Sequence, residues 1–195
     1  MNVTGLFEEP NVIDDSDLQI SPDGRLRHLL TLKTLGKEHI SQILDEAETF
    51  LSPLGHPAVR TQCLKGLTVA NLFFEPSTRT RASFDLAAKR LGADVLNLDV
   101  NTSSRKKGES IIDTIYTLQA MQIDVFVVRD ASAGVSSYIA QNVEGHVSIL
   151  NAGEAEVSHP TQGLLDLLTI RQHKPNFGNL IVTIVGDISH SRVAR

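Results

Sequence analysis

The sequence predicts an α/β fold, with a parallel β-sheet covered by helices on both faces and followed by the truncated start of a second α/β domain. Short apolar runs rich in Val, Ile, Leu and Phe alternate with segments whose apolar residues recur at helical spacing. The runs are continuously apolar, as expected of parallel strands buried on both faces. One more apolar run, at 180–185, lies close to the last residue, which predicts a second domain present only in part.

The first domain is predicted from four strands and four helices, taken in chain order, and a fifth helix follows it. The strand runs lie at 67–74, 93–98, 124–128 and 147–150. The helical segments lie at 40–51, ended by Ser52-Pro53; at 77–91, ended by Gly92; at 111–119; at 135–142; and at 160–174, opened by Pro160 or Thr161 and ended by Pro175. Helices alternating with apolar strands favour one compact sheet domain.

The domain boundaries follow from these elements. Residues 1–24 are acidic without periodicity and are predicted to be a loosely ordered tail. Residues 25–155 form the predicted sheet domain, and 156–178 a helix that connects it to the next domain. Residues 179–195 are predicted to start the second domain, with a strand at 180–185 and a strand-to-helix turn from Gly186-Asp187.

Composition narrows the class of protein. The chain has 195 residues, of which 41% are hydrophobic, and its 18 basic and 23 acidic residues give a net charge of −5. This balance disfavours binding to nucleic acid or a membrane surface, although it allows a local basic site. The single cysteine, Cys63, can form neither an internal disulfide nor a zinc cluster. No apolar run approaches 18 residues and no leader pattern is present, so we expect a cytoplasmic protein.

The stretch 75–81 has the features of an anion-binding site. It joins a predicted strand to a helix, where orphan backbone N–H groups and about half a positive charge favour an anion. Ser77, Thr78, Arg79 and Thr80 add hydroxyl and guanidinium donors, and Arg79 can bind two phosphate oxygens. The alternative is a capped helix with solvated arginines. Two arginines in the first turn oppose the helix dipole unless an anion compensates them, so phosphate binding is favoured.

Further polar residues follow the other predicted strands. The 103–107 loop follows the second strand, Arg129 the third, and His159 with Gln162 the fourth. Each has an ordinary explanation: a solvated charge run, a surface ion pair, or a capping or core histidine. Ligands of open parallel sheets bind beyond the carboxyl ends of the strands, so these residues are predicted to converge on one site.

Several motifs resemble the aspartate and ornithine carbamoyltransferase family, and the aspartate branch more closely. The run F-E-P-S-T-R-T-R-A-S-F resembles the family's carbamoyl phosphate signature, and the similarity extends from about Leu29 to the end of the chain. The further matching runs are K-K-G-E-S at 106–110, V-V-R at 127–129, H-P-T-Q-G-L-L-D at 159–166 and V-G-D-x-x-x-S-R at 185–192. The sequence departs from the aspartate branch at Asp130, where a histidine is usual, and at Gly163.

The resemblance implies transfer of the carbamoyl group of carbamoyl phosphate to L-aspartate, with no cofactor or metal. Arg79, Thr80, Arg129 and His159 are the implied catalytic residues, and Lys107 and Arg192 the implied aspartate ligands. A homotrimer with shared sites is implied, in which Ser103 and Lys107 come from the neighbouring subunit; regulatory or dihydroorotase-like partner chains are also compatible with it. The implied carbamoyl phosphate ligands are Ser77, Thr78, Arg79, Thr80, Arg129, His159 and Gln162.

The chemistry of these residue types is consistent with that implication. Ser77, Thr78, Arg79 and Thr80 would hold the phosphate. Thr80, Arg129 and a neutral His159 would donate to the carbonyl oxygen and stabilise an oxyanion, and the Gln162 amide oxygen would accept from the carbamoyl NH2. The departing phosphate can take the proton of the amine.

Two alternatives remain open from the sequence. Ornithine carbamoyltransferase would share the phosphate motif and H-P-x-Q; Lys107, which suits a second carboxylate, and Thr161 with 164–166 favour aspartate. The chain could also be a carbamoyl phosphate-binding fragment that is inactive on its own. The motifs of nucleotide-binding folds, G-x-x-x-x-G-K-[ST] and G-x-G-x-x-G, do not occur.

Overall fold

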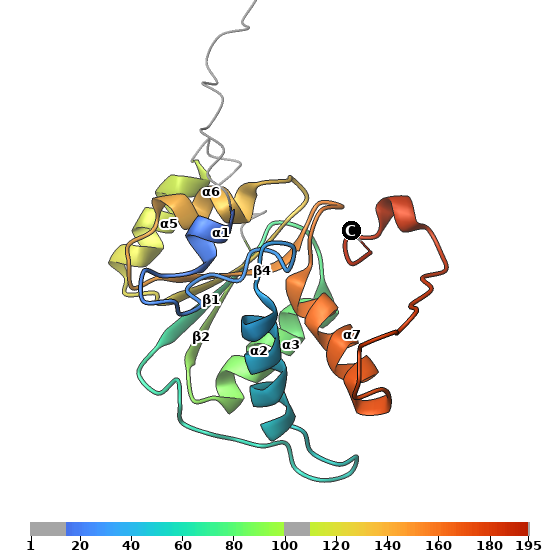
Figure 1. The fold of residues 1–195 in the computed structure, drawn as a ribbon. Helices are drawn as coiled ribbons and strands as arrows, with labels where there is room; N and C mark the ends of the chain where they lie inside the picture. The colour runs from blue at the N-terminus through green and yellow to red at the C-terminus, as the bar shows by residue number, and fades with distance from the viewer. Residues whose placement is uncertain (1–14, 100–109, 195) are drawn as a thin grey trace, which may run out of the picture.

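A four-stranded parallel β-sheet forms the centre of the computed structural model, which describes residues 15–99 and 110–194 (Figure 1). The strand order is β2-β1-β3-β4. The strands are β1 (Thr68–Phe73), β2 (Asp94–Asp99), β3 (Val125–Asp130) and β4 (Ser148–Glu154), and every neighbouring pair is parallel. The prediction of a parallel α/β sheet is therefore confirmed, although β4 runs four residues further than its predicted end.

Helices cover both faces of this sheet, as predicted (Figure 1). One face carries α5 (Ile111–Ala120), α6 (Val135–Asn142) and a short helix, α1 (Asp15–Gln19), that packs on α6. The other face carries α3 (Thr78–Arg90), which lies over β1 and β2. At the β4 edge, α2 (Lys37–Thr49) and α7 (Pro160–His173) pack against each other.

Alternating side chains of each strand build two separate cores. On the α5–α6 side, strand residues such as Leu72, Phe126 and Ile149 are buried with helix residues such as Ile115. On the α3 side, the core holds strand residues 69, 73, 127 and 152 and receives Ala88 from α3. Burial on both faces explains why these strands are continuously apolar in the sequence.

The segment 29–35 joins the edge of β4 to the α2–α7 pair. The Leu29 N–H donates to Ile149 O at 2.8 Å, and the Asn151 N–H donates to Leu29 O at 2.9 Å. Leu29 and other leucines of this edge form a third apolar cluster with α2 and α7. At the surface beside this cluster, Arg171 of α7 forms ion pairs with Asp45 and Glu48 of α2 at 2.6 and 3.0 Å. The helix that carries His159 at its start is thereby fixed to the sheet.

Residues 15–24, expected to belong to a loosely ordered tail, are ordered in the structure. They include α1 and a turn, and the Gln19 side chain is fully buried. Its Oε1 accepts from the N–H groups of Leu30 and Thr31 at 2.7 and 2.9 Å, and its Nε2 donates to Thr34 Oγ1 at 3.0 Å. The prediction was wrong here because a hydrogen-bonded glutamine, together with Leu18 and Ile20 packed on the cores, anchors the segment.

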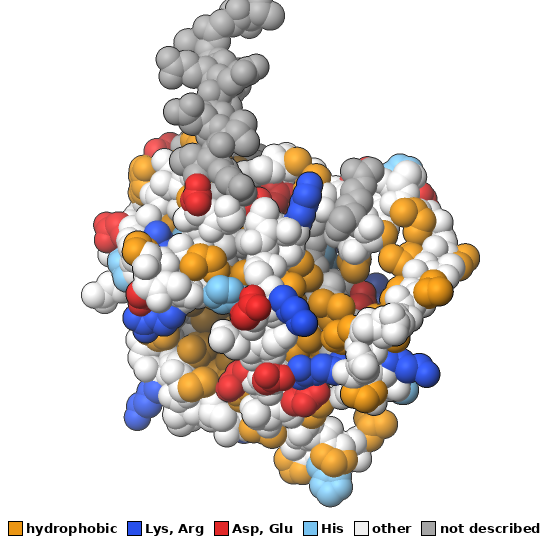
Figure 2. Space-filling view, viewed as in Figure 1, with side chains coloured by type: hydrophobic (Ala, Val, Ile, Leu, Met, Phe, Trp, Pro, Cys, Tyr) orange, Lys and Arg blue, Asp and Glu red, His pale blue; other side chains and the backbone are white. Residues whose placement is uncertain are grey.

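The strand predicted at 180–185 is also absent, and this prediction was wrong. These residues are irregular; Ile181 and Val185 are 92% and 91% exposed, and no described strand lies beside them. An apolar run becomes a strand only where another strand satisfies its backbone groups. The helix expected after Gly186-Asp187 is a single 3-10 turn, Ile188–His190. Figure 2 shows hydrophobic side chains at the surface of this C-terminal segment.

None of the helices in the described parts of the chain is long and apolar enough to cross a membrane.

Candidate functional site

The candidate site lies at the point where the strand order of the sheet reverses. From β1 the chain moves to one side, to β2, and later to the other side, to β3 and β4. Between β1 and β3 this leaves a crevice at the carboxyl ends of the strands, the usual ligand position in open α/β sheets. Phe73 is paired with Arg129 across it, and the Phe74 N–H donates to Arg129 O at 2.9 Å. Residues that leave β1 therefore meet the end of β3.

The start of α3 provides donors on one side of the crevice. Ser77 is the N-cap residue, but its side chain forms no capping hydrogen bond, and the first turn contains no acidic residue. The backbone N–H groups of that turn thus have no side-chain cap. Thr78, Arg79 and Arg81 are exposed on it. The structure thus lacks the side-chain cap of the ordinary-helix alternative, whereas its arginines are exposed as that alternative expects.

A cavity of about 280 Å³ brings together three of the predicted site residues. Thr80 of α3 lies on one wall, and His159 and Gln162, at the start of α7, lie on the other. Ser77, Thr78 and Arg79 belong to the same turn as Thr80 but do not line this cavity. The remaining lining residues are Ser83, Phe84, Ala87, Thr161 and Leu165.

His159 is a neutral hydrogen-bonding group at pH 7. Burial, helped by the nearby Arg129 and Arg192 cations, lowers its pKa from 6.5 to about 4. Its Nδ1 lies 3.3 Å from Thr161 Oγ1. Gln162 donates from Nε2 to Asp166 Oδ1 at 3.1 Å. Because the amide nitrogen makes this bond, the amide oxygen is the acceptor that Gln162 can offer to a ligand. The cavity therefore offers a neutral imidazole and an amide acceptor.

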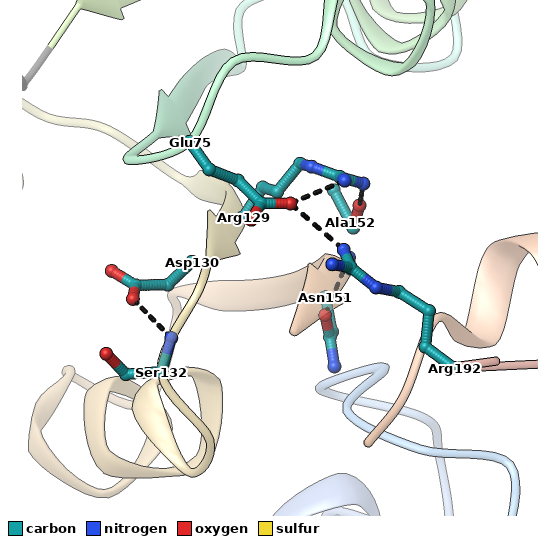
Figure 3. Close-up of polar contacts among 8 residues, drawn as sticks. Glu75, Arg129, Asp130, Ser132, Asn151, Ala152 and Arg192 are labelled. Atoms are coloured by element: carbon teal, nitrogen blue, oxygen red, sulfur yellow. Dashed lines mark hydrogen bonds and ion pairs between the residues drawn. The ribbon is translucent and has the colours of Figure 1, made fainter. Parts of the chain in front are cut away.

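Glu75 joins two arginines beside this cavity (Figure 3). Its Oε1 lies 2.5 Å from Arg129 Nη2 and 3.0 Å from Arg192 Nη1. Arg129 Nη1 also donates to Ala152 O at 3.0 Å, while its buried Nε has no partner among the described residues. Burial lowers the pKa of Arg129, and the charge of Glu75 opposes this shift. Two guanidinium groups thus share one carboxylate.

Gly153 allows the two arginines to approach β4. Its φ is +119°, a conformation that side chains rarely adopt. A Cβ at this position would lie 2.6 Å from Arg129 Nη1 and 2.9 Å from Arg192 Nη1. Neither Gly153 nor Glu75 was identified as a site residue from the sequence. The available signals were the glycine at the end of the fourth strand and the single carboxylate of the 75–81 motif.

The two departures from the aspartate branch have structural explanations. Asp130 is buried, and its Oδ1 accepts from the Ser132 N–H at 2.7 Å in the turn that follows β3. Gly163 lies in the first turn of α7, where an added Cβ would be 2.8 Å from Leu32 Cδ1. Neither residue lines the cavity shared by Thr80 and His159.

The remaining predicted residues divide into two groups. Arg192 is half-buried, and it lines a second hollow of about 400 Å³ with Glu75, Glu156 and residues of the 131 and 155–157 turns. Ser103 and Lys107 lie outside the described residues.

Within residues 15–99 and 110–194 no group of three or more His, Cys, Asp or Glu side chains could hold a metal ion.

This combination is an α/β domain with polar and cationic side chains gathered at the carboxyl ends of its strands. The family model of the aspartate/ornithine carbamoyltransferase carbamoyl-P binding domain matches residues 27–172. The chain belongs to this family.

Solved structures of aspartate transcarbamoylases are similar to the chain. The catalytic subunit from M. jannaschii is 40% identical with a TM-score of 0.76; the alignment covers 87% of this chain and 54% of that one. The Trypanosoma cruzi enzyme with carbamoyl aspartate and phosphate is 32% identical with a TM-score of 0.76, over 86% and 53% of the two chains. The same enzyme with N-(phosphonacetyl)-L-aspartic acid is 34% identical with a TM-score of 0.75, over 86% and 51%. The chain thus spans about half the length of these proteins.

Proposed function

We propose that this chain is the carbamoyl phosphate-binding part of an aspartate carbamoyltransferase. The reaction transfers the carbamoyl group of carbamoyl phosphate to the amino group of L-aspartate and yields N-carbamoyl-L-aspartate and phosphate, an early step of pyrimidine synthesis. The observation that carries the proposal is the cavity where Thr80, next to the uncapped start of α3, faces a neutral His159 and Gln162.

The first step is binding of the phosphate group at the start of α3. The uncapped N–H groups and the exposed Arg79 supply donors and positive charge, and Ser77 and Thr78 add hydroxyls. Arg79 forms no ion pair with another described residue, so its guanidinium is available to a dianionic ligand. The proposed clamp therefore combines a helix terminus with a bidentate cation.

The second step is polarisation of the carbamoyl carbonyl. Thr80 and His159 line one cavity, and Arg129 lies close enough to lower the pKa of His159. Donors fixed around a developing oxyanion stabilise it, and loss of one donor costs about a hundredfold to a thousandfold in rate. Because His159 is neutral at pH 7, it donates a hydrogen bond without competing for the proton of the attacking amine. The Gln162 amide oxygen accepts from the carbamoyl NH2.

The second substrate is proposed to bind beside Arg192. Arg192 borders the hollow next to Glu75 and offers a cation for the α-carboxylate of aspartate. The similar T. cruzi structure with N-(phosphonacetyl)-L-aspartic acid supports aspartate over ornithine as the acceptor. Ser103 and Lys107 of a neighbouring subunit complete the proposed site in a cytoplasmic homotrimer, with which regulatory or dihydroorotase-like chains could associate.

The domain boundaries are part of the proposal. Residues 25–155 bind carbamoyl phosphate, residues 156–178 connect the domains, and residues 179–195 begin the amino-acid domain. Holding both substrates at reacting distance is worth roughly 7–11 kcal/mol of the barrier. The 195-residue chain is therefore proposed to bind carbamoyl phosphate weakly and to turn over only traces.

The testing experiment combines binding with a product assay. Calorimetry should detect phosphate binding to the 195-residue chain and its loss in Arg79→Ala, with an unchanged circular dichroism spectrum. A longer chain that carries an amino-acid domain should form carbamoyl aspartate and not citrulline. Unchanged affinity in Arg79→Ala, or citrulline as the main product, would contradict the proposal.

A further inference from the structure

A chain of polar side chains crosses the α3 side of the sheet. Asn71 of β1 donates from Nδ2 to Asn97 Oδ1 of β2 at 2.8 Å, and Asn97 Nδ2 donates to Asp85 Oδ1 of α3 at 2.8 Å. Lys89, one turn further along α3, binds Asp85 at 2.8 Å. The two asparagines are paired in register across β1 and β2. The sheet is thus connected to the middle of α3 by directional bonds.

These residues interrupt an otherwise apolar face. Val69 and Phe73, which flank Asn71 on the same face of β1, are buried core residues. Asn71 is fully buried, and its Oδ1 has no partner among the described residues. A buried amide costs free energy unless it is hydrogen-bonded, and an apolar side chain would fit this face at lower cost. The polar chain therefore contributes something other than burial.

Apolar packing alone holds α3 weakly in place. Of its residues only Ala88 is buried; Phe84 is half-buried and Leu86 is 49% exposed. Apolar contacts are non-directional. The small apolar contact between α3 and the sheet therefore allows the helix to slide or to turn about its axis. Hydrogen bonds with fixed donors and acceptors do not allow this. The bonds to Asp85 consequently set both the rotation and the axial position of α3.

We propose that Asp85 and Asn97 are positioning residues for the phosphate-binding end of α3. Asp85 lies five residues after Thr80, about 7.5 Å along the helix axis, so a shift at Asp85 moves the first turn by a similar amount. That turn must keep its place opposite His159, with which Thr80 shares a cavity. This inference rests on the proposed function, because it assigns the network to the same phosphate site.

Reversal of the hydrogen-bonding groups provides a direct test. In Asn97→Asp two carboxylates face each other, at positions 85 and 97. Asp85→Asn keeps an acceptor for Asn97 but loses the charge that attracts Lys89. In the double variant D85N/N97D, the new carboxylate accepts from Asn71 and from the new amide, so both bonds re-form. Asp124→Asn is the matched control, because Asp124 Oδ2 accepts from the Thr68 N–H at the opposite end of the sheet.

The measurements are calorimetric titration with inorganic phosphate, thermal unfolding, and amide hydrogen exchange of α3, all on the 195-residue chain. We expect N97D to weaken phosphate binding by at least about threefold, which is the scale of a partly exposed charge pair. D85N should weaken it less, and D85N/N97D should return to within about twofold of wild type. D124N should lower the melting temperature and leave the affinity unchanged.

The outcomes separate this inference from the proposed function. Equal phosphate affinity in all variants, or a double variant as weak as N97D, would overturn the inference while the phosphate site stands. If the wild type binds no phosphate, the proposed function fails, and hydrogen exchange still decides the placement of α3. Faster exchange in N97D that the double variant reverses supports that placement; equal exchange in all variants overturns it.

Discussion

Replacement of Gly153 by alanine should damage the site in two separable ways. The backbone there has φ of +119°, and an L-residue in a left-handed conformation costs about 1–2 kcal/mol. In addition, the new Cβ would lie 2.6 Å from Arg129 Nη1, too close for any non-bonded contact. The guanidinium must move away from Glu75, with which it forms an ion pair whose side chains are only 14% and 19% exposed.

The second effect is the larger one. Breaking a buried, hydrogen-bonded ion pair costs up to about 3–5 kcal/mol, and partial movement of the side chain recovers some of this. Gly153→Ala should therefore lower the free energy of unfolding by roughly 3–5 kcal/mol, a large share of a typical domain stability of about 5–15 kcal/mol. Affinity for carbamoyl phosphate should fall at least about tenfold, because Arg129, a proposed ligand of its carbonyl oxygen, is displaced.

Two other glycines serve as matched controls in urea unfolding and in calorimetry with carbamoyl phosphate. Gly134 has φ of +83° with nothing within 4 Å of an added Cβ, so Gly134→Ala reports the backbone cost alone, about 1–2 kcal/mol. Gly145 has neither a positive φ nor a neighbour, so Gly145→Ala should change stability by less than about 0.5 kcal/mol. If Gly153→Ala costs no more than Gly134→Ala and binds carbamoyl phosphate normally, the packing of the arginines on Gly153 does not constrain them.

Three further predictions concern pH, charge and assembly. Burial holds the pKa of His28 at about 4, against 6.5 in the unfolded chain. The unfolded chain therefore binds the proton first as the pH drops, so the free energy of unfolding should fall between pH 6.5 and pH 4. Urea unfolding at several pH values should show this slope, and a His28→Gln variant should lose part of it. Glu75→Gln should weaken the ion pairs with Arg129 and Arg192. It should raise the KM for aspartate, measured by steady-state kinetics, more than it lowers the affinity for phosphate, measured by calorimetry. In a longer active chain, Arg79→Ala and Lys107→Ala subunits, each inactive, should regain activity when mixed; hybrid trimers without activity would refute shared sites.

The sequence pattern predicts the elements of this fold better than their arrangement. The central strands β1 and β3 show their burial on both faces as mainly apolar runs, and helix α3 shows a stripe that includes Phe84 and Ala88. The strand order β2-β1-β3-β4 depends on pairing between residues far apart in the chain, which local periodicity does not report. The same limit explains the error at 180–185, where a β-favouring run has no strand beside it among the described residues.

The sequence did not predict those site residues whose role depends on partners far apart in the chain. Thr80, His159 and Gln162 were predicted because their side chains are polar and follow strands, and the structure places them around one cavity. Glu75 acts by joining two arginines from distant parts of the chain, and Gly153 by the absence of a side chain. Such roles are visible only once the partners are known.

The charges of the site explain why the imidazole and the guanidinium groups have different tasks. Glu75 offsets part of the positive charge of Arg129 and Arg192, but both guanidinium groups still lower the pKa of His159 against a smaller opposing effect of Asp166. Together with burial, these guanidinium groups keep His159 neutral at pH 7, and their positive charge suits the anionic substrate of the proposed function. A protonated His159 would add a third cation and hold the phosphate product more tightly. Two arginines that share one carboxylate therefore help to keep His159 a neutral hydrogen-bond donor for the proposed substrate.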